Sequence, residues 1–255
     1  MPASARATPS RRARTSSSSR WSSTRSRRRR NNALLVTQPV RDAYASRVAE
    51  YIQVCGTIET ADPRDRDLVA SWARDIDGPI VDVGCGPGQW TAFLHDDGAS
   101  VVGVDPVPEF IDEARRRYPD AHYAVGRAGA LDFPPGSKAG ILAWFSLIHV
   151  DPAALDPVLD DVARVLKPGG RLLVGFFEGP ELVRFEHKVY PAWYWPTADL
   201  TRRLDAAGFS VVETRTRMDP ASTRSGGSIS AVLRARDDAT HPRRRSDPPS
   251  PLVDK

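Results

Sequence analysis

The sequence is poor in cysteine, has no long apolar run and contains no acidic residue in its first 32 positions. Its two cysteines, Cys55 and Cys85, stand in unrelated contexts, so they form neither a zinc-binding spacing nor a disulfide framework. That pattern is typical of proteins from the reducing cytoplasm, where we expect this protein to work. No stretch approaches the roughly 18 apolar residues that span a bilayer, and no apolar segment follows the N-terminal arginines as a secretory signal requires. We therefore expect no membrane partner.

The two ends of the chain differ in composition from its middle. Residues 1–32 contain ten arginines and almost nothing apolar, and residues 236–255 are polar and rich in proline. Such segments cannot offset the entropy lost on ordering, so we expect two disordered tails around one domain over residues 33–235. An arginine tail of this kind is compatible with nucleic-acid or membrane binding, with an import peptide, or with a translated leader ahead of the true start. We favour the leader, or a tail without a function.

The net charge of the chain is set by its N-terminal tail. The whole chain has 36 basic and 32 acidic residues, and removing residues 1–30 leaves 26 basic residues against 32 acidic ones. The remainder is therefore mildly acidic, with a formal charge of about −6. A basic groove for nucleic acid is not expected in such a domain, and we expect a small-molecule partner instead. The sequence leaves the oligomeric state open.

Short apolar runs alternate with helical patterns along the domain. The expected strands are Ile80–Val83, Val101–Val104, His122–Val125, Ile141–Phe145 and Arg171–Phe177. The expected helices cover residues 40–54, 63–75, 89–96, 108–118, 153–166 and 197–207. Unbroken apolar strands between helices predict a Rossmann-like, doubly wound α/β fold with a mostly parallel, seven-stranded sheet. Two consecutive final strands, Phe209–Arg217 and Ile229–Ala235, predict a C-terminal antiparallel hairpin at one edge of the sheet.

The stretch IVDVGCGPGQW, residues 80–90, combines an acid in a buried-looking strand with three glycines in a tight turn. Glycines in such a turn indicate that a ligand or another backbone comes very close. A dinucleotide fingerprint has the spacing G-x-G-x-x-G, but the position of its third glycine, residue 89, is glutamine here. The spacing is instead D-x-G-x-G-x-G over residues 82–88.

This pattern resembles the first motif of class I S-adenosylmethionine-dependent methyltransferases. The resemblance continues with GVDPVPEFIDEAR (103–115), LAWFSLIHV (142–150) and ARVLKPGGRLLVGFFEG (163–179). It covers roughly residues 40–235 and is strongest for small-molecule methyltransferases similar to those of quinone biosynthesis. It implies S-adenosylmethionine as the cofactor.

The resemblance also implies which residues hold that cofactor. They are Asp82, Gly84, Cys85, Gly86, Gly88, Asp105, Pro106, Arg127, Ala128, Trp144 and Phe145. Asp82 would lie near the cofactor's ammonium, or else tie the glycine loop together by accepting backbone N–H groups. Asp105 ends the second strand, where a carboxylate can accept both hydroxyls of a ribose. The end of the fourth strand, around residues 143–145, would supply a backbone carbonyl and an apolar wall.

One position departs from the family pattern. Members usually carry an acid soon after the third strand, facing the adenine amino group, and the matching residue here is Arg127 in VGRAGALDF. A guanidinium cannot accept a hydrogen bond from that amine, although it can stack on the adenine ring. Asp132, five residues on, is one replacement for the acid. Otherwise apolar contacts and the Ala128 backbone hold the adenine.

His149 is the candidate catalytic residue, because it follows the fourth strand and is the one histidine of five in a motif-bearing position. Methyl transfer needs the acceptor held near the methyl group, and it needs a general base only if the acceptor must lose a proton early. His149 can be that base or can position the acceptor; alternatively, it packs in the loop before Asp151 caps the next helix. We expect no metal, because the chain has no H-x-x-x-H or H-E-x-x-H pair.

The insertion EGPELVRFEHKVYPAWYWP, residues 178–196, is rich in aromatic residues. In this architecture it would overhang the methyl group, opposite Tyr44 and Tyr51 from the first helix. These aromatic residues either cover the sheet or line a pocket for an apolar or aromatic substrate. We therefore predict a methyltransferase that acts on a small molecule. The alternatives are a nicotinamide-dependent Rossmann oxidoreductase, a non-catalytic S-adenosylmethionine-binding protein, and an RNA methyltransferase that uses the arginine tail.

Overall fold

The structure, a computed structural model, describes residues 38–218 and 224–235. The tails predicted over residues 1–32 and 236–255 lie outside these described residues. Within the described ranges, no helix is long and apolar enough to cross a membrane.

The domain begins with a helical region that the sequence predicts as one continuous helix over residues 40–54. The structure divides it into a helix over residues 38–45 and helix α2 (Val48–Cys55), with a turn at Ser46 and Arg47 between them. A short 3-10 helix, η1 (Ile58–Thr60), leads to helix α3 (Pro63–Arg74). Helix α3 begins as expected, because the Asp62 carboxylate accepts a hydrogen bond from the Arg64 backbone N–H.

Strands and helices then alternate, as the apolar runs predict, except that a loop without a helix joins β3 to β4. The strands are β1 (Ile80–Val83), β2 (Val101–Asp105), β3 (His122–Val125), β4 (Lys138–Trp144) and β5 (Leu166–Glu178). The helices are α4 (Gln89–Asp96), α5 (Pro108–Arg117), α6 (Pro152–Val165) and α7 (Thr197–Ala206). Strand β5 starts earlier than expected: Leu166 pairs with Lys138 and Arg171 pairs with Gly140, so residues 167–170 bulge out of the ladder.

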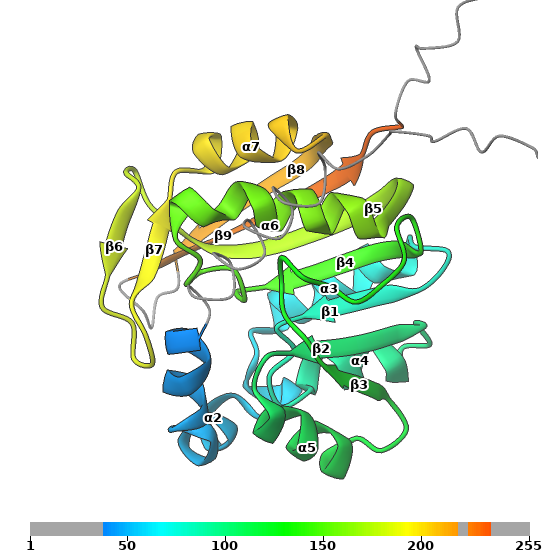
Figure 1. Cartoon of the computed structure of the whole chain (residues 1–255), viewed down its shortest axis with the longest axis vertical. Helices are drawn as coiled ribbons and strands as arrows, with labels where there is room; N and C mark the ends of the chain where they lie inside the picture. The colour runs from blue at the N-terminus through cyan, green and yellow to red at the C-terminus, as the bar shows by residue number, and fades with distance from the viewer. Residues whose placement is uncertain (1–37, 219–223, 236–255) are drawn as a thin grey trace, which may run out of the picture.

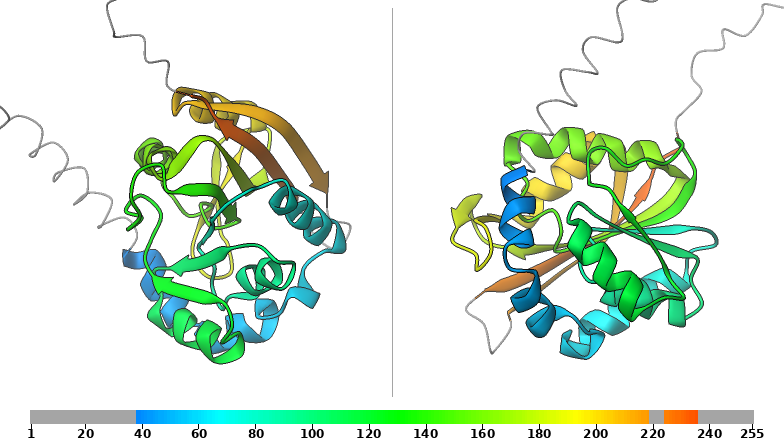
Figure 2. Two further views of the ribbon diagram at one scale, coloured as in Figure 1. Left: turned by 90° about the vertical axis from the view of Figure 1, so that its right-hand side faces the viewer. Right: turned by 60° about the horizontal axis from the view of Figure 1, so that its bottom comes forward.

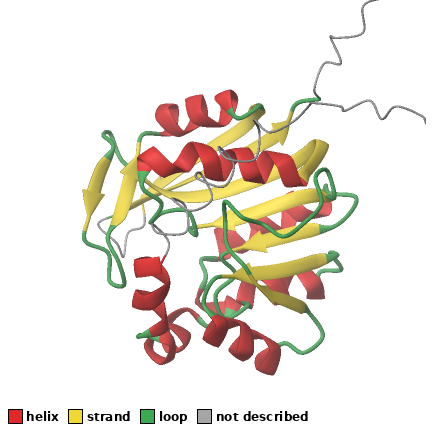
Figure 3. Ribbon diagram, viewed as in Figure 1, coloured by secondary structure: helices red, strands yellow, loops and turns green. Residues whose placement is uncertain are grey.

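The sheet confirms the predicted doubly wound α/β architecture (Figures 1 and 3). Its parallel part has the strand order β3-β2-β1-β4-β5. Strand β9 (Ser225–Leu233) pairs antiparallel with β5, and β8 (Phe209–Met218) pairs antiparallel with β9. These last two strands form the predicted C-terminal hairpin at one edge of the sheet.

The insertion at residues 178–196 contains two short strands that the sequence does not predict. Strand β6 (Val183–Phe185) pairs antiparallel with β7 (Ala192–Trp195), and β7 continues the sheet beside Phe177 and Glu178 of β5. Strand β4 ends opposite Gly175, and β9 occupies the other edge of β5. The β6–β7 hairpin therefore lies beyond the carboxyl end of β4, at the edge of the sheet where ligands bind in this architecture.

Helices cover both faces of the sheet, with α6 on one face and α3 on the other (Figures 1 and 2). Alternating residues of the central strands supply the two cores. Val81, Val83 and Ile141 pack with residues of α6 and α7, whereas Ile80 and Leu142 pack with residues of α3 and α4. Because of this alternation, neighbouring side chains at the carboxyl ends of β1 and β4 point to opposite faces of the sheet.

Candidate active site

The three glycines of the loop after β1 all have left-handed backbone angles, with φ values of 75°, 54° and 90° for Gly84, Gly86 and Gly88. A Cβ at Gly84 would lie 2.3 Å from the Ser146 Cβ, and one at Gly88 would lie 2.8 Å from the Ala114 Cβ. These two glycines therefore let neighbouring protein segments approach. A Cβ at Gly86 would meet only the Tyr51 ring within 4 Å, at 3.7 Å. Gly86 is thus the loop glycine with the most room beside it.

Asp105 at the end of β2 holds the glycine loop in place. One carboxylate oxygen accepts a hydrogen bond from the Gly86 backbone N–H at 2.9 Å, and the other accepts from the Val107 backbone N–H at 2.8 Å. The residue is 6% exposed, and this burial raises the pKa of Asp105 to about 6 against the two hydrogen bonds, which lower it. Each oxygen keeps a further lone pair, so the carboxylate can still accept from a ligand.

Asp82 lies on the α4 side of the sheet, where the Thr91 hydroxyl donates a hydrogen bond to it at 2.6 Å. The residue is 2% exposed, and burial raises the pKa of Asp82 to about 7. Cys85 is also buried. Its Sγ packs against Gly103 of β2, where an added Cβ would lie only 2.9 Å from the sulfur. Burial raises the pKa of the Cys85 thiol, which therefore stays protonated and unreactive.

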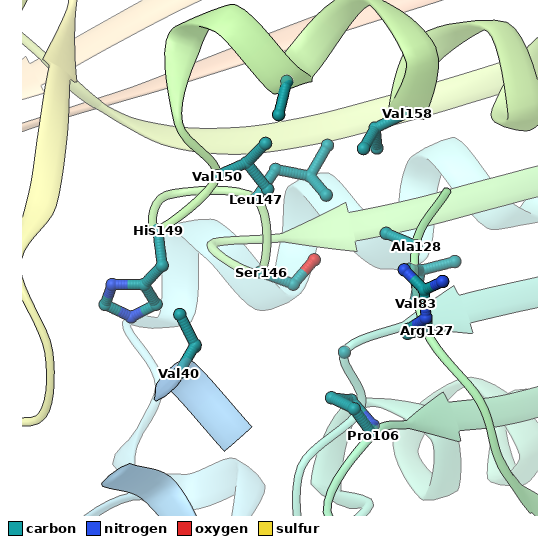
Figure 4. Close-up of a pocket in the computed structure, with 12 residues that line it drawn as sticks. Val40, Val83, Pro106, Arg127, Ala128, Ser146, Leu147, His149, Val150 and Val158 are labelled. Carbon is teal, nitrogen blue, oxygen red and sulfur yellow. The ribbon is translucent and has the colours of Figure 1, made fainter. Parts of the chain in front are cut away.

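A cavity of about 710 Å³ opens above the glycine loop on the α6 side of the sheet, and we call it the glycine-loop cavity. It is lined by Val40, Val83, Gly84, Pro106, Arg127, Ala128, Ser146, Leu147, His149, Val150, Ala154 and Val158. Figure 4 shows His149 and Val40 at one end, Arg127, Ala128 and Pro106 at the other, and Ser146 between them. The structure thus brings five of the sequence-predicted site residues to one mostly apolar cavity.

The end of β4 is arranged differently from the expectation. The Trp144 side chain packs on Trp90 of α4, with ring centroids 5.8 Å apart, and Phe145 has a left-handed φ of 52°. Both residues line a second cavity of about 670 Å³ on the α3 side, beside Arg64 and Arg217. Because the strand alternates and Phe145 turns the chain, the two aromatic side chains do not line the glycine-loop cavity.

Ser146 and Leu147, which the sequence analysis does not single out, take that place in the glycine-loop cavity. The Ser146 Oγ is buried and has no hydrogen-bond partner among the described residues, and the same holds for Oε1 of Gln89, directly after the glycine loop. Buried polar atoms without partners are rare in native proteins, and Ser146, which lines the cavity, favours a polar ligand there. No sequence pattern marks Ser146, because only the close approach of Gly84 reveals it.

Arg127 lines the glycine-loop cavity at the end where the family pattern expects an acid. Burial lowers the pKa of its guanidinium, whereas the carboxylate of Asp161 in α6 raises it. Asp132 is exposed and does not line the cavity, so the structure does not bring it to the place of the missing acid. Asp161 is a nearby carboxylate that the sequence analysis does not single out.

His149 is buried, with 8% exposure, and both of its ring nitrogens have partners. Its Nδ1 lies 3.0 Å from the Pro191 carbonyl oxygen, and its Nε2 lies 2.8 Å from the Tyr44 hydroxyl. A carbonyl only accepts, so Nδ1 carries the proton and Nε2 accepts from Tyr44. Burial lowers the pKa of His149, which favours this neutral form. Nε2 is therefore the nitrogen that can take up a proton once its hydrogen bond from Tyr44 is released.

The aromatic residues of the insertion divide between the site and the fold. The His187 and Tyr190 rings lie 5.2 Å and 6.1 Å from the His149 ring, centroid to centroid. The Phe185 and Tyr194 rings stack on each other at 4.1 Å, and Trp195 is buried in the core beside α7. Only part of the insertion therefore faces the candidate site.

The described residues contain no group of three or more His, Cys, Asp or Glu side chains that could hold a metal ion. The site instead offers a glycine loop with room at Gly86, a mostly apolar cavity, the unpartnered Ser146 oxygen and a neutral histidine. Such a set fits a largely apolar ligand with a few polar groups.

Comparisons with known proteins place residues 80–170 in a family described as a methyltransferase domain. The chain is 33% identical over 170 residues to an uncharacterized methyltransferase of Synechocystis, and the match covers 63% of this chain and 76% of that relative. It is 37% identical over 107 residues to the demethylmenaquinone methyltransferase of Beutenbergia cavernae, where the match covers 42% of this chain and 44% of the relative. The chain thus spans less than half of that second relative.

Solved structures share the fold at lower identity. The 1,6-didemethyltoxoflavin-N1-methyltransferase of Burkholderia thailandensis, solved with 1,6-didemethyltoxoflavin and S-adenosylhomocysteine, superposes with a TM-score of 0.66 at 20% identity. The match covers 80% of this chain and 90% of that one. A methyltransferase structure from Methanosarcina mazei matches 68% of this chain with a TM-score of 0.57 and 22% identity.

Proposed function

Because this chain belongs to the class I S-adenosylmethionine-dependent methyltransferases, we propose that it transfers a methyl group to a small apolar or aromatic molecule. The observation that carries this proposal is the glycine-loop cavity, which runs from the glycine loop and Arg127 at one end to His149 at the other. One cavity thus offers a place for the cofactor and a base for the acceptor.

The cofactor fits the residues present. We assign the ribose to Asp105, whose oxygens keep lone pairs beside Gly86, and the adenine to Pro106, Arg127 and Ala128. The unpartnered oxygens of Ser146 and Gln89 can accept hydrogen bonds from the bound molecule. We assign the ammonium of the methionine part to Asp82, whose carboxylate accepts a hydrogen bond from Thr91 of α4.

The bound cofactor supplies an electrophilic methyl group, and the chain's own residues supply position and a base. His149 Nε2 accepts a proton from an acceptor that must lose one, while the Pro191 carbonyl accepts from Nδ1–H and stabilises the charged ring. The cavity walls around this step are mostly apolar, which favours a low local polarity.

The proposed acceptor is small because the same mostly apolar cavity must also receive the cofactor. The relatives named demethylmenaquinone and 1,6-didemethyltoxoflavin methyltransferases support a small-molecule acceptor. A protein that only binds the cofactor is the alternative to test. Work in the cytoplasm stays a prediction that rests on the cysteine pattern.

A screen for S-adenosylhomocysteine formation tests the proposal. The full chain is incubated with S-adenosylmethionine and pools of small aromatic metabolites, beside His149→Ala and Asp105→Ala variants as controls. We expect formation with some pools, a loss of roughly 10²-fold or more in His149→Ala because the base is removed, and unchanged cofactor affinity in that variant. Cofactor binding without turnover of any pool would favour the non-catalytic alternative.

A further inference from the structure

The hydroxyl of Tyr44 donates a hydrogen bond to Nε2, the basic nitrogen of His149. The O···Nε2 distance is 2.8 Å, and the two rings meet edge to face with centroids 5.5 Å apart. Because Nδ1 donates to the Pro191 carbonyl, Nε2 has one lone pair, and the phenol uses it. An acceptor that gives its proton to His149 therefore cannot do so while Tyr44 stays in place.

The Tyr44 ring contacts other aromatic rings besides His149. It contacts Tyr51 and Phe110 edge to face, at centroid distances of 5.5 Å and 6.1 Å. Tyr51 is the residue that a Cβ on Gly86 would touch at 3.7 Å. Ring contacts thus lead from His149 through Tyr44 to Tyr51 beside the loop, and they already hold a phenol with aromatic rings around it and a base at its hydroxyl.

The segment that carries Tyr44 is separate from the rest of the first helix. Residues 38–45 are helical, Ser46 and Arg47 form a turn, and α2 starts at Val48. Val40 of the same segment lines the glycine-loop cavity. The turn gives this segment a point about which it can move without unwinding α2.

We propose that Tyr44 occupies the place of the acceptor, and that the acceptor is a hydroxyarene methylated on its phenolic oxygen after residues 38–45 move aside. This inference rests on the proposed function and narrows it to one acceptor class. The acceptor's O–H bond breaks and its proton passes to His149 Nε2. The phenolic oxygen bonds to the methyl carbon, and the electron pair of the broken carbon–sulfur bond stays on the sulfur, which becomes the neutral thioether. The imidazolium then returns its proton to water.

Removing the Tyr44 side chain tests the inference, because the cavity that it leaves should fit 4-methylphenol, the free analogue of that side chain. Tyr44→Ala should bind 4-methylphenol at least about tenfold more tightly than the wild-type chain in calorimetry, as an engineered apolar cavity binds a ligand of matching shape. Binding should shift the ¹⁵N resonance of His149 Nε2. With S-adenosylmethionine present, Tyr44→Ala should also release S-adenosylhomocysteine and methylate the phenol on oxygen.

Tyr51→Ala is the matched control, because Tyr51 contacts the same Phe110 ring without a hydrogen bond to His149. In that variant 4-methylphenol should leave the His149 resonance unchanged. Binding to Tyr44→Ala that is no tighter than to the wild type, or that leaves His149 unperturbed, overturns the inference. So does bound 4-methylphenol that is not methylated. A wild-type chain that fails to bind S-adenosylhomocysteine would contradict the proposed function itself, whatever the result with 4-methylphenol.

Tyr44→Phe keeps the test available if Tyr44→Ala does not fold. The ring stays, but the hydroxyl that competes for Nε2 is gone, so 4-methylphenol should bind roughly threefold to tenfold more tightly than to the wild type, the scale of one lost neutral hydrogen bond. If Tyr44 instead remains in place and holds the acceptor through its hydroxyl, the same variant should bind 4-methylphenol more weakly, and that result contradicts the inference.

Discussion

At the scale of single residues, the site depends on two buried carboxylates with different partners. Asp105 accepts from two backbone N–H groups, whereas Asp82 accepts from the Thr91 hydroxyl. Asp105 thus ties the glycine loop to β2, the role that the sequence analysis offers as an alternative for Asp82. Ligand binding by either carboxylate stays a proposal; one measurement below tests it for Asp105, and a second tests the protonation of buried Asp82.

Asp105→Ala should weaken S-adenosylhomocysteine binding by roughly 1.5–3 kcal/mol, because charged hydrogen bonds to the ribose are lost. Calorimetry of the variant measures this directly. Thermal unfolding of the same variant serves as the control, since loss of the Gly86 and Val107 hydrogen bonds also affects the fold. A folded variant that binds with wild-type affinity would remove the ribose role.

The stability of the chain should depend on Asp82 in a defined direction. Burial raises the pKa of Asp82 from 3.8 to about 7, so between about pH 4 and 7 the folded chain keeps a proton that the unfolded chain has released. The free energy of unfolding contributed by this group therefore falls as the pH rises through that range. Asp82→Asn stays neutral at every pH. The melting temperature of this variant minus that of the wild type should therefore be larger at pH 8 than at pH 5. An equal difference at both pH values would contradict this assignment.

At the scale of elements, the parallel strands are what the sequence predicts well. The apolar runs mark the parallel strands, and the expected bounds of β1 and β3 match the structure. The end of β4 is less accessible to prediction, because the left-handed φ of 52° at Phe145 redirects the chain without a glycine to signal it. Trp144 and Phe145 consequently line the α3-side cavity, and Ser146 reaches the glycine-loop cavity.

Two further elements show why sequence patterns fall short in this chain. The apolar stripe over residues 40–54 continues through the turn at Ser46 and Arg47, so periodicity alone does not reveal the break. Strands β6 and β7 have only three and four residues and depend on pairing with each other and with β5. Such pairing is a tertiary effect, which local propensity does not contain.

The glycines of the loop should differ from ordinary turn glycines in their sensitivity to substitution. Gly88 and Gly98 have nearly equal φ values, 90° and 91°, but a Cβ at Gly88 would meet Ala114 and Tyr123 at 2.8 Å, whereas a Cβ at Gly98 has nothing within 4 Å. Gly98→Ala should cost about 1–2 kcal/mol of backbone strain. Gly88→Ala should cost a further 1–3 kcal/mol or so from overpacking. Denaturant unfolding measures both, and equal costs would contradict the packing role of Gly88.

At the scale of the whole molecule, the alternation of strands and helices predicts the doubly wound sheet, and that sheet places the ends of β1, β2 and β4 at one edge. The meeting of Tyr44 with His149 could not be predicted, because 105 positions separate the two residues and only the folded sheet brings them together. The predicted tails, residues 1–32 and 236–255, lie outside the described residues.

Deletion of residues 1–32 should leave the melting temperature and the S-adenosylhomocysteine affinity unchanged. The reason is composition: the segment has ten arginines and almost no apolar side chain to pack against the domain. Differential scanning calorimetry and titration of the shortened chain measure the two quantities. A loss of several degrees would show that the segment contributes to the folded domain.

Calorimetric titration of the full chain with S-adenosylhomocysteine and, separately, with NAD tests most directly whether the glycine loop and Asp105 form a methyltransferase cofactor site. The D-x-G-x-G-x-G spacing over residues 82–88 and the glycine-loop cavity predict saturable binding of S-adenosylhomocysteine at one site per chain and no binding of NAD. Binding of NAD, or the absence of S-adenosylhomocysteine binding by the folded chain, would contradict the account.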